Sequence, residues 1–263
     1  MLDRNVEFDE SSGFSVFYNF TLADQFVPSK IFAIAEHPEL CEMLVNGVVT
    51  EWQESPSELD HHFGCADIRT FLIPGDNTIE ILAKRFDVLL EVDSMYLQGD
   101  FSVNEIEGRW VLDKPTELQY GSWKDQGLPF YPYAVNYAYK VHLNQKPEKA
   151  MLDIGQYEAS VISVSVNGQS AGLLHFDGIR AMDISDYLYV GNNQIVFRVC
   201  GTFKNLMGPH FAQARGTAWP AMWQESPEYM PDATEYDLMD YGLMVKPTLC
   251  INKADTNAKE EST

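Results

Sequence analysis

The chain has 263 residues, of which 45% are hydrophobic and 13% aromatic, a composition typical of a folded protein. Its 39 acidic and 18 basic residues give a formal net charge of −21, which repels phosphate backbones and anionic membrane surfaces. Composition therefore argues against nucleic-acid and membrane binding, and no apolar run is long enough to span a bilayer.

The first residues, MLDRNVEFDESSG, contain no apolar segment of the kind found in secretory signals. The four cysteines are scattered without C-x-x-C spacing, which favours reduced thiols over a disulfide framework or a zinc site. They are Cys41, Cys65, Cys200 and Cys250. We therefore expect a cytoplasmic protein.

Strand-like segments follow one another along the chain. Most alternate apolar with polar residues or are rich in Val, Ile, Phe and Tyr, and Gly, Pro, Asn or Asp separate them. In chain order they cover 14–22, 30–37, 42–52, 78–86, 88–103, 109–113, 136–143, 150–155, 160–168 and 193–201. Helical periodicity is confined to single turns near 37–43 and 209–215. This pattern is typical of β-sandwiches and excludes most α/β folds.

One sequence pattern occurs twice. The first copy has VNG at 45–47, DI at 67–68 and LIPGDNTIEI at 72–81, and the second has VNG at 166–168, DI at 183–184 and LYVGNNQIVF at 188–197. Asn-Gly suits a hairpin turn with positive φ, and Gly-x-Asn reverses the chain into a long apolar strand. The repeat predicts two tandem domains of one architecture, at 1–115 and 116–251, followed by a disordered polar tail at 252–263.

Residues 168–172, GQSAG, match the G-x-S-x-G pattern of serine hydrolases, and acids and His210 follow in the order of a catalytic triad. A nucleophile elbow requires a strand, a tight turn and then a helix, whereas Ser170 begins a second short strand. Alignment with residues 46–51 of the first copy places Ser170 in the strand after a hairpin. A small ester hydrolase using Ser170, or a glycoside hydrolase using two carboxylates, is therefore the least favoured interpretation.

The pattern VNG…DISxYL…GxNxI resembles the jelly-roll, galactose-binding-like β-sandwiches that accompany catalytic domains in glycoside hydrolase family 2 and in α-L-rhamnosidase-type enzymes. Residues 121–143, GSWKDQGLPFYPYAVNYAYKVHL, and 152–174, LDIGQYEASVISVSVNGQSAGLL, carry most of it. The resemblance covers about residues 14–250 and implies an all-β fold of two tandem antiparallel β-sandwiches. It bears on function only by association.

In enzymes of that kind the catalytic carboxylates lie on a (β/α)₈ barrel, and this sequence has no alternating series of strands and helices to form one. The resemblance therefore implies an accessory segment or a stand-alone relative, and we expect no catalysis by this chain itself. The first domain is interpreted as a spacer or packing module. The second is the better candidate for binding, because it contains the aromatic loops.

Two aromatic-rich segments are candidates for sugar recognition, which uses flat aromatic faces and polar side chains on loops. The first is 121–133, and the second is an insertion at 205–232 that has no counterpart in the first copy. The candidate residues are Trp123, Tyr131 and Tyr133 in the first segment, and His210, Arg215, Trp219, Trp223 and Glu225 in the second. The alternative is a structural module whose aromatic residues dock on a catalytic domain or form an oligomer.

Metal sites are only weakly indicated. Adjacent histidines such as His61 and His62 point to opposite faces of an extended strand, so they rarely share one ion. The acidic run from Asp232 to Asp240 offers oxygen ligands for a structural calcium ion, but it lacks the glycine and the spacing of an EF-hand. We expect no cofactor, with structural calcium as the alternative, and a carbohydrate or a glycoside hydrolase catalytic domain as the partner.

Overall fold

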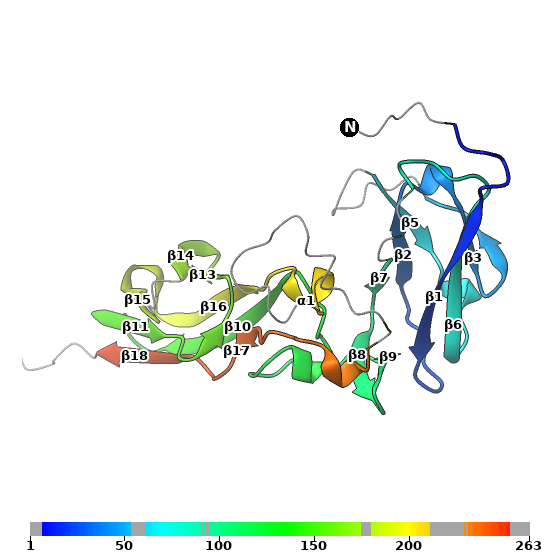
Figure 1. The fold of residues 1–263 in the computed structure, drawn as a ribbon. Coiled ribbons are helices and arrows are strands. Elements are labelled where there is room, and N and C mark those ends of the chain that lie inside the picture. The colour runs from blue at the N-terminus through cyan, green and yellow to red at the C-terminus, as the bar shows by residue number, and fades with distance from the viewer. Residues whose placement is uncertain are drawn as a thin grey trace, which may run out of the picture. The chain divides into compact units, whose positions relative to one another are not determined.

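The computed structural model describes residues 7–53, 62–90, 92, 95–174, 180–210, 229 and 231–252. The chain divides into two compact units, 1–116 and 117–263. Strands dominate both units, and almost all pair in antiparallel fashion (Figure 1). The predicted all-β sandwich fold is thereby confirmed. In the described part of the chain, the helices are too short to cross a membrane.

Unit 1 consists of a six-stranded and a three-stranded sheet. The six-stranded sheet has the order β4 (Val48–Thr50), β3 (Glu42–Val45), β6 (Gly75–Ala83), β1 (Phe14–Leu22), β9 (Arg109–Asp113) and β8 (Ser102–Ile106). The three-stranded sheet has the order β5 (Phe63–Asp67), β2 (Ile31–Glu36) and β7 (Tyr96–Gly99). Alternate side chains of the two sheets, among them Leu22, Ile31 and Ile79, pack into one core. The only parallel pair in the described strands joins β1 to β9.

Unit 2 has a four-stranded sheet in the order β10 (Ala134–Leu143), β16 (Gly191–Cys200), β13 (Val161–Val166) and β14 (Gln169–Leu174). A three-stranded sheet joins β15 (Ala181–Asp183), β11 (Lys149–Asp153) and β18 (Thr248–Asn252), and β12 (Tyr157–Glu158) pairs with β17 (Gly242–Leu243). Leu152, Ile162 and Phe197 lie in the core that these sheets enclose. The orders β14-β13-β16-β10 and β15-β11-β18 repeat the orders β4-β3-β6-β1 and β5-β2-β7 of unit 1.

In the residues that the structure describes, helical structure is limited to single turns. The described α-helix is α1 (Lys204–Met207), and 3₁₀ turns cover Pro38–Leu40, Arg69–Phe71, Lys124–Gln126, Ser185–Tyr187 and Ala233–Glu235. The turn at 38–40 falls within the predicted turn at 37–43. The predicted strand at 88–103 is wrong in part, because residues 88–90 form no strand and β7 begins only at Tyr96.

The two copies of the sequence pattern form the same hydrogen-bonded corner. In unit 2, Asn167 donates from Nδ2 to Asn193 Oδ1 (2.8 Å) and to the carbonyl oxygen of Tyr187 (2.9 Å). Asn193, which is 2% exposed, donates in turn to the carbonyl oxygens of Tyr189 and Gly191. In unit 1 the same bonds join Asn46, Asn77 and the carbonyl oxygens of Phe71, Ile73 and Gly75. The recurring residues therefore fix the same turn in each unit.

Candidate functional site

Trp123 is a core residue of unit 2. Its side chain is 1% exposed, and its indole N–H donates to the hydroxyl of Tyr137 at 2.7 Å. The backbone N–H of Trp123 donates to the carbonyl oxygen of Tyr241, which attaches the segment to the strand region near β17. This placement corrects the expectation that Trp123 contacts a sugar, because neither face of its ring is open to solvent.

Five side chains, which we call the aromatic cluster, form two contacting groups: Phe130, His210 and Tyr236 in one, and Tyr131 and Tyr133 in the other. The two groups are joined through the neighbouring residues Phe130 and Tyr131. The rings of His210 and Tyr236 lie 4.6 Å apart between centroids, and Phe130 contacts Tyr236 at 5.9 Å. The rings of Tyr131 and Tyr133 lie 5.8 Å apart. All five side chains are half-buried. Of the sequence-predicted site residues, Tyr131 and Tyr133 thus lie in one group and His210 in the other.

Buried Asn205 holds the segments of the aromatic cluster together. Its side chain is 3% exposed and donates to the carbonyl oxygens of Pro129 (3.0 Å) and Met239 (2.9 Å). Its Oδ1 accepts from the backbone N–H of Met239 at 2.9 Å. Lys204 forms an ion pair with Asp237 at 3.0 Å between Nζ and Oδ2. These contacts fix loops from three parts of the sequence, so the side chains that these loops carry are held in place by the packing around them.

The titratable groups of the aromatic cluster favour uncharged forms. Burial raises the pKa of Tyr131, and the neighbouring Tyr133 adds to the increase, while the positive charge of Arg198 opposes it. Burial lowers the pKa of His210, and the ammonium of Lys204 lowers it further. At neutral pH the cluster therefore offers a neutral phenol and a neutral imidazole, each able to donate and accept hydrogen bonds.

Four predicted site residues, Arg215, Trp219, Trp223 and Glu225, lie outside the described residues. The same applies to His61. Tyr229, which is described, is 68% exposed, and its hydroxyl donates to Glu235 Oε2 at 3.4 Å. Of the residues predicted for sugar contact, only those of the aromatic cluster and Trp123 therefore have described positions.

Ser170 lies in β14, the strand that follows the Asn167-Gly168 hairpin, and faces Ser165 of β13. Both turn residues have positive φ, 53° for Asn167 and 80° for Gly168. β14 continues from Ser170 to Leu174 where an elbow would begin a helix, and among the described residues no histidine hydrogen-bonds to Ser170. The strand, turn and helix of a nucleophile elbow are thus not formed here.

The acidic run of unit 2 is used locally. Asp232 accepts hydrogen bonds from the backbone N–H and the hydroxyl of Thr234 at the start of a 3₁₀ turn. Asp237 pairs with Lys204, and Asp240 pairs with Lys124 at 3.0 Å. Within the described part of the chain, no group of three or more His, Cys, Asp or Glu side chains is placed to hold a metal ion.

The four cysteines are not joined by disulfides, and burial raises the pKa of the Cys41 thiol to about 11.

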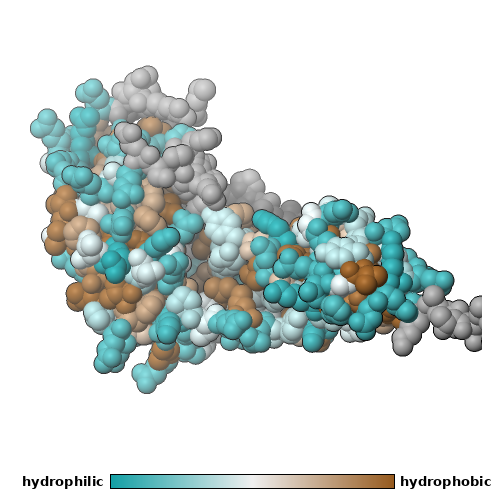
Figure 2. Space-filling model, turned by 180° about the vertical axis from the view of Figure 1, so that it is seen from behind, coloured by the Kyte–Doolittle hydropathy of each residue, from teal (hydrophilic) through white to brown (hydrophobic). Residues whose placement is uncertain are grey.

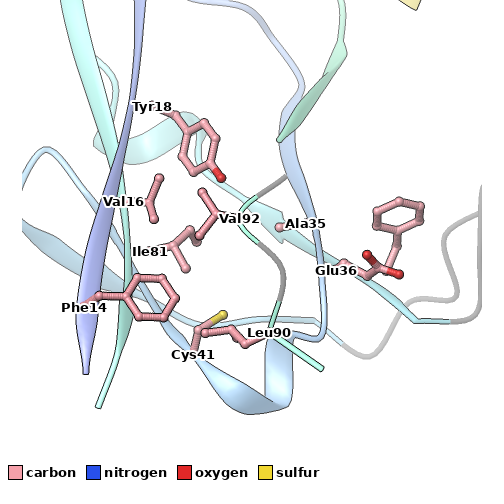
Figure 3. Close-up of a pocket in the computed structure, with 10 residues that line it drawn as sticks. Phe14, Val16, Tyr18, Ala35, Glu36, Cys41, Ile81, Leu90 and Val92 are labelled. Carbon is pink, nitrogen blue, oxygen red and sulfur yellow. The ribbon is translucent and has the colours of Figure 1, made fainter. Parts of the chain in front are cut away.

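Unit 1 contains a small apolar pocket between its two sheets (Figure 3). Val16, Ile81 and Leu90 line it together with Cys41, and the hydroxyl of Tyr18 points into it. Its volume of about 30 Å³ has room for one or two water molecules but not for a sugar ring. This pocket is therefore no candidate for a carbohydrate site.

Phe130, Tyr236 and Asn205 belong to the aromatic cluster or its support, and they are not among the site residues predicted from the sequence. Phe130 directly precedes Tyr131, so it lies in the aromatic-rich segment 121–133 that the sequence indicates. The sequence does not show that its ring contacts Tyr236. Nothing in the sequence places Tyr236 beside residue 130, because more than a hundred residues separate them. Asn205 follows the last strand of the repeat, where an asparagine is typical of an ordinary turn.

No protein-family model and no curated protein matches the chain. Among solved structures, a rhamnosidase from Novosphingobium sp. PP1Y aligns at 17% identity and a TM-score of 0.38, over 91% of this chain and 22% of that one. An α-L-rhamnosidase from Streptomyces avermitilis aligns at 12% identity and a TM-score of 0.29, over 76% and 23%. A β-D-mannosidase from Dictyoglomus thermophilum gives 10% and 0.27, over 73% and 25%. The similarity is distant, and the chain spans a quarter or less of each of these proteins.

Proposed function

We propose that the chain is a non-catalytic carbohydrate-binding module whose aromatic cluster contacts the sugar. The observation that supports this most is the fixed set of half-exposed rings at the loops of unit 2. An aromatic face packs against the C–H face of a pyranose, and neutral phenol and imidazole groups hydrogen-bond to its hydroxyls. The resemblance of the strand pattern to accessory domains of glycoside hydrolases supports the same assignment. Unit 1 then serves as a spacer or packing module.

The proposal is tested by titrating the full chain with a panel of neutral and acidic oligosaccharides, and calorimetry or NMR measures the binding. Replacing Tyr133 or Tyr236 by alanine is expected to weaken binding about tenfold, which corresponds to about 1.4 kcal/mol. Tyr189→Ala is the matched control, because Tyr189 is an exposed tyrosine of the same unit outside the aromatic cluster. Absence of binding to every sugar at millimolar concentration contradicts the proposal.

A second candidate function is a structural module that forms an oligomer. It is favoured by one outward row across the six-stranded sheet of unit 1, in which three hydrophobic side chains share the register with Glu80. In that row Phe17 and Val49 are exposed, and Glu80 and Leu44 lie between them. Hydrophobic side chains gather in patches on the surface in Figure 2. Such patches often mark protein interfaces. If this is their role, light scattering will show a concentration-dependent mass that Phe17→Glu abolishes, while a monomer at all concentrations argues against it.

A further inference from the structure

The outward face of the four-stranded sheet in unit 2 carries no carboxylate among the described residues, in a chain whose acidic residues outnumber its basic ones by 39 to 18. Alternation directs every second residue of β10 and β16 to solvent, and these include Lys140, His142 and Arg198. The other outward residues are uncharged: Asn136, Ala138, Asn192, Gln194, Val196, Val161, Ser163, Ser165, Ser170 and Leu173. We call this surface the basic sheet face.

The fold itself does not require an acid-free face at this place. The corresponding sheet of unit 1 carries Asp76 and Glu80 on β6 and Glu42 on β3 at outward positions. Counted from Asn77 and its counterpart Asn193, Asp76 corresponds to Asn192 and Glu80 to Val196. Counted from Asn46 and its counterpart Asn167, Glu42 corresponds to Ser163. Carboxylates are thus accepted by this architecture and are missing only from the face of unit 2. That distribution indicates a surface suited to an anionic ligand.

Arg198 lies on the central strand β16 of the basic sheet face, between β10 and β13. The strand register places it directly opposite Asn136 of β10 on one side and Ser163 of β13 on the other. Its guanidinium makes no hydrogen bond or ion pair with another described residue. Three neighbouring strands thus present a guanidinium, an amide and a hydroxyl in one row, and a guanidinium matches both oxygens of a carboxylate at once.

The row of Arg198 adjoins Tyr131 of the aromatic cluster. Ala134, two residues before Asn136 on β10, pairs with Cys200, two residues after Arg198 on β16. The carbonyl oxygen of Ala134 accepts a hydrogen bond of 3.5 Å from the Tyr131 hydroxyl. The charge of Arg198 is also close enough to stabilise the ionised form of Tyr131. One extended ligand is therefore able to touch both Arg198 and Tyr131.

We propose that the ligand is an acidic polysaccharide and that Arg198 binds the carboxylate of a uronate unit. Asn136 and Ser163 hydrogen-bond to the same sugar, and the neighbouring units of the polysaccharide lie on the aromatic cluster. This inference rests on the proposed function and names its ligand class. A uronate pairs a planar carboxylate with a pyranose ring, and these are the two features that a guanidinium beside aromatic rings recognises.

The test compares an oligogalacturonate of defined length with its fully methyl-esterified form, because the two share every ring and differ in charge. We expect the full chain to bind the acid at least tenfold more tightly than the ester at low salt, and the preference to shrink as salt is added. Arg198→Gln should reduce the affinity for the acid to that for the ester, while Arg198→Lys keeps part of the preference. Arg180→Gln, at an exposed arginine of the same unit away from this sheet, is the matched control and should change nothing.

Each other outcome overturns a different statement. Equal binding of acid and ester that Arg198→Gln leaves unchanged overturns the uronate assignment and leaves the carbohydrate proposal standing. Equally tight binding of polyglutamate, a polyanion without sugar rings, shows that the face recognises acidic polypeptides and overturns the ligand class. Failure of the full chain to bind any oligosaccharide overturns both proposals.

Discussion

Asparagine at the corner of each unit has a specific physical role. In unit 2 the amide of Asn193 accepts from the backbone N–H of Tyr189 and from Asn167, and it donates to two carbonyl oxygens. Only an amide offers both an acceptor and two donors on so short a side chain. Because Asn193 is buried, replacing it leaves these partners without hydrogen bonds.

We expect Asn193→Ala to destabilise unit 2 by about 3 kcal/mol, since several buried backbone groups lose their partner at once. Asn193→Asp should cost at least as much, because a carboxylate oxygen then faces the carbonyl oxygens of Tyr189 and Gly191. Gln194→Ala, at the exposed next residue, should stay within about 0.5 kcal/mol of wild type. Urea denaturation measures all three, and equal effects at residues 193 and 194 would contradict this account.

His210 makes a pH-dependent contribution to stability whose sign follows from its lowered pKa. The folded chain binds fewer protons at His210 than the unfolded chain, whose histidine titrates near its usual value of about 6.5. Stability from this group is therefore present at neutral pH and is lost as the pH falls through that value. His210→Gln should lose less stability than wild type on acidification from about pH 7 to about pH 5. NMR titration gives the pKa directly, and a value at or above 6.5 would falsify the assignment.

At the scale of elements, β17 and the segment around Trp123 depend on a glycine. Gly242 has a φ of 134°, and a Cβ at this position would lie 2.6 Å from the carbonyl oxygen of Gly121 and 2.9 Å from the indole nitrogen of Trp123. The N–H of Gly121 donates to the carbonyl oxygen of Leu243 at 2.7 Å. Gly242 thus allows the two segments to pair at close distance while Trp123 fills the core.

Gly242→Ala should therefore destabilise unit 2 by about 3 kcal/mol or more, because backbone strain and steric overlap act together. Gly168→Ala separates the two effects. Gly168 has a φ of 80° but nothing within 4 Å of the added Cβ, so only the backbone term of about 1–2 kcal/mol remains. Thermal unfolding of both variants measures the difference, and a smaller loss at 242 than at 168 would refute the steric account.

The strands and turns were largely predictable, because alternation and Asn-Gly pairs are local signals. β1 occupies the predicted 14–22, and the predicted segment at 160–168 contains β13 and its hairpin turn. The orientation of single aromatic residues was not predictable, and Trp123 shows why: its segment carries several aromatic rings, and only tertiary packing decides which one is buried. The cluster of Phe130, His210 and Tyr236 likewise depends on long-range contacts that no local pattern reports.

Arg198 could have been found from sequence. It occupies an alternate position in NQIVFRVCG, the predicted strand at 193–201, so its outward direction follows once Ile195 and Phe197 are assigned to the core. The difference in charge between the two copies of the repeat is visible in the sequence as well, since Asp76 and Glu80 of the first copy correspond to Asn192 and Val196 of the second. Alternation in the sequence thus predicts which strand residues point to the outward face of a sheet. It does not predict which loop residues come together at the end of that sheet.

At the scale of the whole molecule, each unit has a hydrophobic core of its own. The core of unit 1 is built from residues between Leu22 and Leu112, and that of unit 2 from residues between Trp123 and Leu243. Among the described residues, neither core draws on a side chain of the other unit. Both units lie within the size range in which domains fold alone.

We therefore expect residues 117–263, produced alone, to fold cooperatively and to bind the same oligosaccharides as the full chain within about threefold in Kd. Circular dichroism on heating and calorimetric titration test the two statements. In the full chain, Asn193→Ala should lower the melting temperature of one transition and leave the other in place. A single transition that shifts as a whole would show that the two units unfold together.

The corner asparagines also bear on how the protein ages. Asn167 and Asn46 each precede a glycine, and Asn-Gly is the dipeptide in which backbone nitrogen attacks the side-chain amide most readily, releasing ammonia and leaving aspartate or isoaspartate. In the folded chain the Oδ1 of Asn167 accepts from the N–H of Gln194 and its Nδ2 donates twice, so the side chain is held away from that reaction. Deamidation at these two positions should therefore occur almost only in unfolded molecules. The deamidated fraction found by mass spectrometry in a stored sample would then record how long each unit has spent unfolded.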